Sequence, residues 1–391
     1  MIGSRLFFVA VAWFLTIEVG VTASSWALAL FQFAPTVAMM PITLAVVDLV
    51  GRRRIVIASD AFRAAVCVVG AGVAAAGHVA AGLLTAVVIV RVFDTLYAPS
   101  IRAGVTHAAG GFGRFSPQYM LLLVNSSASL LAPLVVPFAT SAPVSVVLLL
   151  NGATYLVSMI GCTYGGRLMD ADIGEQISVR AALRRWRRTI REGWASFRSV
   201  AILRRVVPTL PLIDMAYAAM VVALPALAMN TVHGQSAWYY AVLVLAYGLS
   251  RIAGAELSRR FIHRRHDGTL LALNCTLQGT FYLIAAAAPA PWLFVSCLVA
   301  IGILSGASTL SVNEIVGDAV PRHTRGRVFA LIGFAVVVVI PFGPMISGLA
   351  SGASPNLTLC VVGTVLVAAG IGPLASRDVW AFRASPDESA R

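Results

Sequence analysis

The chain has 391 residues, of which 59% are apolar and 12% are charged, and its mean hydropathy is +0.87. This balance leaves too little polar surface to cover a soluble particle of that length, which excludes a soluble multidomain enzyme. The net charge is +13, but the cationic residues, all arginine, are dispersed over loops. Anionic lipid is therefore the expected partner and nucleic acid is not.

Six apolar stretches, each close to the roughly 20 residues that span a hydrocarbon core, occupy the first part of the chain. They are Leu6–Val21, Trp26–Val47, Ile55–Gly77, Ala80–Ile101, Tyr119–Thr140 and Val144–Gly165. The first is short, and Thr22-Ala23-Ser24 after it resembles a processing site. Cleavage there would invert every later arginine-rich loop, so we predict an uncleaved first helix.

A polar, arginine-rich stretch, 167–205, follows the sixth segment. Its second part carries apolar residues at helical spacing: Val179, Leu183, Trp186, Ile190, Trp194, Phe197 and Ala201. Arginines cover most of the remaining face: Arg180, Arg184, Arg185, Arg187, Arg188, Arg191 and Arg198. We predict that residues 178–205 form a cationic helix in the plane of anionic lipid headgroups. A helix packed under the bundle with a solvated basic face is the alternative.

Six further apolar stretches follow: Val206–Met229, Trp238–Leu257, Thr269–Ala288, Trp292–Val312, Val328–Ala350 and Leu357–Ala375. The expected organisation is a six-helix bundle over 1–166, a basic linker over 167–205, a second bundle over 206–376 and a tail over 377–391. We therefore predict an all-α membrane protein of 12 transmembrane helices in two pseudo-symmetric bundles.

Arginine placement predicts the orientation of these segments. All but three of the 29 arginines lie at alternate ends of the apolar stretches, and cationic short loops are retained in the cytoplasm. Both termini are thus expected in the cytoplasm of a bacterium, with the chain in its cytoplasmic membrane. We expect a monomer.

The two halves repeat one another, and the loop Asp48-Leu49-Val50-Gly51-Arg52-Arg53-Arg54 resembles the Gly-x-x-x-Asp-Arg-x-Gly-Arg-Arg signature of the major facilitator superfamily. Ala58–Ala64, Asn151–Leu156 and Pro321–Val328 resemble the subgroup of enterobactin exporters and macrolide-efflux proteins. Leu44 replaces the first glycine of the signature, and the antiporter glycines of the fifth segment are reduced to Ala132-Pro133. The resemblance implies a transporter fold and, as the leading expectation, proton-coupled efflux of a small amphipathic or hydrophobic compound.

Charges inside the apolar segments are expensive and are candidates for function. Arg91 and Asp94 lie one helical turn apart in the fourth segment, where a simple i,i+3 ion pair and a proton-coupling site are both open readings. Asp214 in the seventh segment and Glu18 in the first are the other candidate coupling acids.

Gating residues are expected at the cytoplasmic helix ends. The resemblance implies that Asp48 closes this side by meeting the N-terminus of the eleventh segment. The predicted gate also includes Gly51, Arg52, Arg53, Asp60, Arg63, Arg325, Gly326 and Arg327. Asp60, Arg63 and Arg251 are expected near the same membrane face, with their side chains extended toward the headgroups.

Cavity-lining residues are expected from the first, fourth, seventh and tenth segments on the same resemblance: Trp13, Tyr97, Met215, Tyr217, Met220 and Ser308. Apolar, aromatic and Met-rich walls suit loose recognition of a hydrophobic substrate. An individual member of this set fits a packing role equally well.

Other function classes are disfavoured. No Gly-x-x-x-x-Gly-Lys-Ser/Thr phosphate loop occurs, which argues against an ATP-driven pump. The six histidines are scattered, and the five cysteines lie in apolar stretches without metal-ligand spacing. We therefore predict no catalytic residue, no metal and no cofactor. An uptake permease and a transport-inactive receptor or scaffold remain as alternatives.

Overall fold

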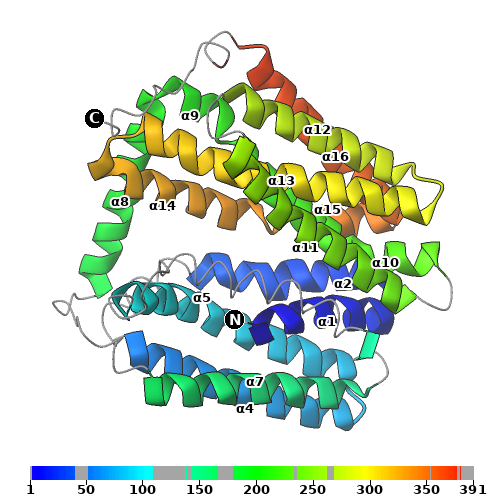
Figure 1. The fold of residues 1–391 in the computed structure, drawn as a ribbon. Coiled ribbons are helices and arrows are strands. Elements are labelled where there is room, and N and C mark those ends of the chain that lie inside the picture. Colours follow the sequence, from blue (N-terminus) through cyan, green and yellow to red (C-terminus); the bar gives the residue numbers. More distant parts are fainter. Residues whose placement is uncertain are drawn as a thin grey trace. The chain divides into compact units, whose positions relative to one another are not determined.

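A computed structural model describes residues 2–39, 52–108, 137–138, 142–165, 179–232, 236–261, 268–352, 354–376 and 379. The regular structure in these ranges is helical, without a strand (Figure 1). The chain divides into two compact units, Met1–Trp186 (the N-unit) and Arg187–Arg391 (the C-unit).

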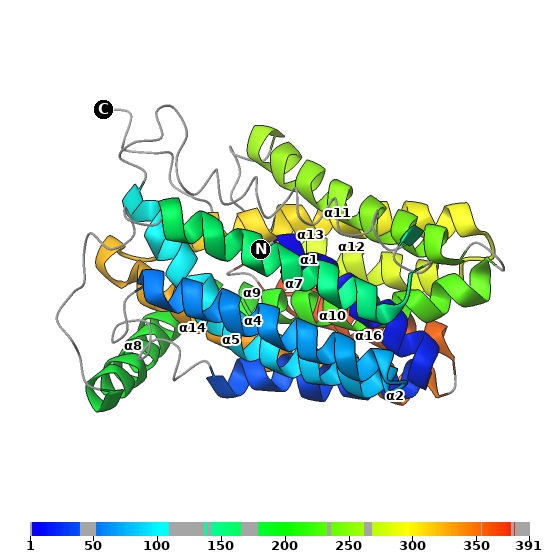
Figure 2. The same cartoon turned by 90° about the horizontal axis from the view of Figure 1, so that it is seen from below.

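The N-unit contains α1 (Ile2–Val19), α2 (Val21–Ala27), the π-helix η1 (Leu28–Phe33), α4 (Arg52–Ala75), α5 (Val79–Ala108) and α7 (Val144–Gly165). α4 packs against both α5 and α7, and these three helices run side by side in both views (Figures 1 and 2). Gly20 separates α1 from α2 and has a φ of 81°. A positive φ of this size is costly for residues other than glycine, which explains the glycine at this position.

Small residues permit the close approach of α4 to its neighbours. A Cβ on Gly70 would lie 2.9 Å from the Gly82 carbonyl oxygen of α5, and one on Gly152 of α7 would lie 3.2 Å from the Cβ of Cys67. Helices in membranes associate through such close packing, because lipid tails are as apolar as the side chains and offer no hydrophobic driving force. α4 is thereby fixed between α5 and α7.

The C-unit contains most of α8 (Val179–Ser199), then α9 (Ala201–Val206), α10 (Thr209–Thr231), α11 (Ser236–Phe261), α12 (Gly268–Ala286), α13 (Pro291–Ala319), α14 (Arg322–Val339), α15 (Phe342–Ser351) and α16 (Pro355–Leu374). α11 pairs with α13, and α12 pairs with α16. In the first pair a Cβ on Gly306 would overlap the Arg251 carbonyl oxygen, and one on Gly254 would overlap the Ile303 carbonyl oxygen.

Within the described residues, ten helices are long and apolar enough to cross a membrane, and a shorter apolar helix covers Ala10–Val19. The predicted segment Val144–Gly165 is helical throughout as α7, and its predicted start at Val144 is confirmed. The predicted fifth segment lies outside the described residues except for 137–138, so the count of twelve stays a prediction. The eleventh is divided into α14 and α15 around Pro341, which lacks the N–H that would continue the helical hydrogen bonding.

The predicted basic helix is present as α8 and α9, separated at Val200, whose backbone is extended. The boundary between the two units falls inside α8. Phe197 from its apolar face is buried in a C-unit core that includes Leu203, Val316 and Val328. This end of the basic stretch is therefore an integral part of the C-unit.

Candidate functional site

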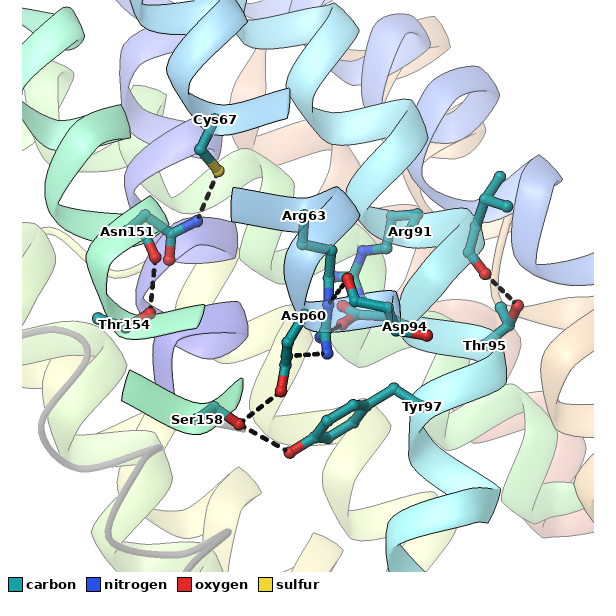
Figure 3. A network of polar contacts seen from close by, with 12 residues as sticks. Asp60, Arg63, Cys67, Arg91, Asp94, Thr95, Tyr97, Asn151, Thr154 and Ser158 are labelled. Atoms are coloured by element: carbon teal, nitrogen blue, oxygen red, sulfur yellow. Dashed lines mark hydrogen bonds and ion pairs between the residues drawn. The ribbon is translucent and has the colours of Figure 1, made fainter. Parts of the chain in front are cut away.

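A buried arginine on α4 organises the main polar cluster of the N-unit (Figure 3). Arg63 donates from Nη1 to Oδ1 of Asp94 on α5 and from Nη2 to Oδ1 of Asp60, each at 2.5 Å. Its Nε donates to the Ser59 carbonyl oxygen at 3.2 Å. The side chains of Arg63 and Asp60 are each only 1% exposed. We call the following set of residues the Arg63 cluster: Arg63, Asp60, Asp94, Arg91, Tyr97, Tyr155 and Ser158.

Aromatic and hydroxyl side chains enclose the same guanidinium. The Arg63 Cζ lies 4.2 Å from the Tyr97 ring centroid and 4.6 Å from that of Tyr155. Ser158 of α7 donates to Oδ2 of Asp60 at 2.7 Å and lies 3.4 Å from the Tyr97 hydroxyl. Both oxygens of Asp60 thus have close partners, and three helices contribute to the cluster.

Asp94 is the more accessible acid of the Arg63 cluster. Its side chain is 16% exposed, and its Oδ2 lies 3.5 Å from Nη1 of Arg91, which is 28% exposed. The Arg91 guanidinium in turn lies 5.6 Å from the Phe8 ring of α1. Asp94 therefore connects an enclosed arginine to a more exposed one.

The predicted contact between Arg91 and Asp94 is confirmed, but the expected placement of Asp60 and Arg63 is wrong. Neither extends toward the headgroups, because Arg63 lies eleven residues into α4, about 16 Å along its axis at about 1.5 Å per residue. The closer partner of Asp94, Arg63, comes from another helix and has no signature in the local spacing around Asp94. The Asp60-x-x-Arg63 spacing, which places an acid and an arginine one helical turn apart, was the sequence signal that could have indicated a polar cluster on α4.

A second pair of opposite charges lies in the C-unit. Nη2 of Arg251 on α11 is 4.0 Å from Oδ1 of Asp214 on α10 and donates to Thr309 of α13 at 3.5 Å. The Arg251 Cζ lies 5.9 Å from the ring of Tyr217, which stacks on Tyr247 at 4.8 Å. Asp214 thus has a partner from a neighbouring helix, and Arg251 belongs to this pair.

The predicted gate is described only in part. Asp48 and Gly51 lie outside the described residues, and Arg52 begins α4. Arg53 donates to the Thr163 carbonyl oxygen of α7 at 2.8 Å. At the start of α14, Arg325 donates to the Val320 carbonyl oxygen at 3.4 Å, and Gly326 is exposed.

Arg327, the last of the predicted gate residues, joins α14 to α8. Its Nη1 lies 2.9 Å from Oε2 of Glu192, whose Oε1 accepts from Nε of Arg188 at 2.6 Å. A Cβ on Gly193 would lie within 3.0 Å of the Arg327 carbonyl group. The beginning of α14 is thus held to the basic helix.

The predicted cavity residues lie in different surroundings in the two units. The Tyr97 ring lies against Arg63 in the Arg63 cluster, and the Tyr217 ring lies near Arg251 of the Asp214–Arg251 pair. Trp13 and Met215 are buried. Met220 accepts from Tyr282 at 3.6 Å and Ser308 accepts from Gln278 at 3.2 Å, so both contact α12. Glu18 is exposed near the end of α1.

The described residues contain no group of three His, Cys, Asp or Glu side chains that could hold a metal ion. The chemistry of both clusters is that of ion pairs and hydrogen bonds between helices. Such groups can exchange protons and charged ligands.

Comparison with known proteins gives a family, a local relative and a fold. The sequence profile of the Major Facilitator Superfamily matches residues 1–344. The multidrug efflux pump Tap of Mycolicibacterium fortuitum is 27% identical over 125 residues, and this match covers 32% of the present chain and 30% of the pump. The predicted enterobactin-exporter and macrolide-efflux subgroup is not reproduced by this relative.

Solved transporters share the fold at low identity. A POT family transporter in complex with 5-aminolevulinic acid has a TM-score of 0.72 at 10% identity, covering 96% of this chain and 93% of that one. A peptide transporter POT in complex with sulfate has a TM-score of 0.70 at 12% identity, covering 96% and 92%. With its apolar helices and a profile match over most of its length, the chain belongs to the major facilitator superfamily, a family of transporters, and is a multi-pass membrane protein.

Proposed function

We propose that this protein is a secondary active exporter that couples the outward movement of a small amphipathic compound to the inward movement of protons. Efflux is supported by the local similarity to a multidrug efflux pump. Proton coupling is supported by Asp94, a partly exposed acid placed between two arginines inside the apolar segments. That placement is the observation on which the proposal rests.

The coupling step follows from the charge balance of the Arg63 cluster. Two carboxylates, Asp60 and Asp94, face two guanidiniums, Arg63 and Arg91, so the ionised cluster is neutral. Protonation of Asp94 leaves one positive charge in excess. Of the two contacts of Asp94, the one to Arg91 at 3.5 Å is longer than the one to Arg63, and it is the contact that would break. Arg91 then becomes available to an anionic or polar group of the substrate, and loss of the proton recaptures it. Proton and cargo would thus favour different states of one switch.

Asp60 is the less suitable proton acceptor. Its side chain is 1% exposed, and both oxygens accept hydrogen bonds, from Arg63 at 2.5 Å and from Ser158 at 2.7 Å. A proton arriving at Asp60 would have to displace one of these donors. We therefore assign Asp60 to holding Arg63 in position.

Two further roles are proposed for the cytoplasmic side. Asp48 would hold this side closed by meeting the beginning of α14, with Arg52 and Arg53 completing the contact. The arginine face of α8 would lie on anionic headgroups, with both termini on the same side and the transporter acting as a monomer.

The direction of transport separates export from uptake, which is the alternative function. Inverted membrane vesicles with the protein, energised to acidify their interior, should accumulate norfloxacin, a fluorescent amphipathic compound that carries an anionic group. Nigericin, which collapses the pH gradient, should release it, and vesicles without the protein serve as the control. Accumulation only in right-side-out vesicles, or accumulation that ignores nigericin, would contradict the proposal.

A further inference from the structure

Two arginines on apolar helices differ in how closely their partners approach them. Arg63 makes two ion pairs at 2.5 Å, lies 4.2 Å from its nearer ring and is 1% exposed. Arg251 has its carboxylate at 4.0 Å and its ring at 5.9 Å, and is 35% exposed. Both lie on apolar helices of comparable length.

The ion pair between Asp214 and Arg251 is more open than the ion pairs of Arg63. A guanidinium carries five N–H donors. Nη2 of Arg251 lies 3.5 Å from Thr309 and 4.0 Å from Asp214, and the Arg251 side chain also has a hydrogen bond to Tyr247. A separation of 4.0 Å exceeds hydrogen-bonding distance. Charges removed from water are costly unless their partners are close, so an open pair inside an apolar bundle is suited to a ligand that completes it.

An aromatic platform adjoins the same two charges. Tyr217 stacks on Tyr247 with ring centroids 4.8 Å apart and an interplanar angle of 17°. The hydroxyl of Tyr247 donates to Ser305 of α13 at 3.2 Å, which fixes the inner ring. Tyr217, only partly buried, presents a flat apolar surface beside Arg251.

We propose that Asp214, Arg251 and Tyr217 form a binding site for a zwitterionic amphipathic compound. Its anionic group would bind Arg251, its ammonium group would bind Asp214 and its flat apolar part would lie on Tyr217. A ligand with one charge would satisfy one member of the pair and leave the other without a partner at low dielectric, whereas a zwitterion satisfies both. This inference names the substrate class of the proposed exporter and rests on that proposed function.

A set of three related probes tests the assignment. Norfloxacin is a flat aromatic zwitterion, its methyl ester keeps only the cationic group and its N-acetyl derivative keeps only the anionic group. Their affinities are measured for the purified full-length protein in detergent at neutral pH, without any gradient. The wild type should bind norfloxacin about tenfold more tightly than either derivative, the equivalent of one lost ion contact of about 1.4 kcal/mol.

Each charge should be responsible for one half of this selectivity. Arg251→Gln should lose about tenfold in affinity for norfloxacin and none for the ester, and Asp214→Asn should lose about tenfold for norfloxacin and none for the N-acetyl derivative. Tyr217→Leu should weaken all three probes alike. Tyr239→Phe, on α11 outside the site, is the control and should leave all affinities unchanged.

Equal affinity of the wild type for the three probes, or an equal loss for all three in Arg251→Gln and Asp214→Asn, would overturn the site. If the single variants do not fold, the double variant Asp214→Arg/Arg251→Asp takes their place. It should retain the preference for the zwitterion, and loss of that preference contradicts the proposal. Binding requires no gradient, so the site and the proposed function can fail separately. Selective binding without proton-driven export would contradict the proposed function but not this site. Proton-driven export without selectivity for the zwitterion would contradict this site but not the proposed function.

Discussion

At the scale of single residues, the function proposed here depends on where charge is enclosed. Arg63 serves two carboxylates with separate ends of one planar group, which a point charge cannot reproduce. Its contacts join α4 to α5, while Ser158 joins Asp60 to α7. Removal of this one side chain therefore affects the junction of three helices.

Replacing Arg63 by alanine should lower the free energy of unfolding by about 3–5 kcal/mol, because Asp60 would remain enclosed without its cation and Asp94 would keep only the longer contact to Arg91. Arg63→Lys should restore only part of the loss. Thermal unfolding in detergent gives the comparison, and the triple variant Asp60→Asn/Arg63→Gln/Asp94→Asn, which removes all three charges, should be more stable than Arg63→Ala. Equal melting temperatures for wild type and Arg63→Ala would contradict the account of this cluster.

At the scale of elements, the basic helix α8 is held to the start of α14 by Glu192 and by the small size of Gly193. The hydrogen bond from Arg188, together with the charge of Arg327, lowers the pKa of the Glu192 carboxyl below its ordinary value of 4.5. A carboxyl whose pKa is depressed on folding stabilises the fold above its unfolded pKa, and this contribution is lost as the pH falls through the folded pKa. The contact should therefore persist at neutral pH and fail in acid.

Glu192→Gln should make α8 more susceptible to limited proteolysis at pH 7, where the wild-type carboxylate holds Arg188 and Arg327. The difference between variant and wild type should shrink below about pH 4.5 as the wild-type carboxyl gains its proton. Digestion across a pH series with an acid-tolerant protease measures this. A difference that stays constant with pH would show that charge at Glu192 is irrelevant to the contact.

Gly193→Ala should also loosen α8, since the added Cβ would overlap the Arg327 carbonyl group. Overpacking of this kind costs about 1–3 kcal/mol, to be measured by thermal unfolding. Gly333→Ala on α14 is the matched control, because a Cβ there meets nothing within 4 Å. Equal stability of the two variants would argue against close packing of α8 on α14.

At the scale of the whole molecule, sequence patterns predicted the helical fold and its family, and for α7 they also predicted the start. α7 begins where hydropathy placed it, because a spanning helix is defined by a local property, its apolar length. The pairing of Asp94 with Arg63 and of Asp214 with Arg251 was missed, because a pair between helices has no fixed sequence separation. The interruption at Pro341 was missed because the apolar pattern continues through it.

Topology is tested by impermeant maleimide on intact cells, in a variant from which the five native cysteines have been removed. Cysteines at Ser141 and Ser354 should react from outside, because both follow apolar segments on the arginine-free side. A cysteine at Ser178, in the basic stretch, should react only after the membrane is permeabilised. External labelling at Ser178 would reverse the orientation.

The central claim, that Asp94 couples protons to export, is tested most directly by comparing uphill transport and exchange in proteoliposomes. Asp94→Asn keeps the size of the side chain and an acceptor for Arg63, but it cannot bind or release a proton. The variant should therefore lose accumulation driven by an imposed pH gradient and retain exchange of labelled for unlabelled substrate at equal concentrations, whereas Arg91→Ala should impair both. Accumulation against a gradient by Asp94→Asn would contradict the account and move the coupling acid elsewhere, with Asp214 the next candidate and Glu18 after it.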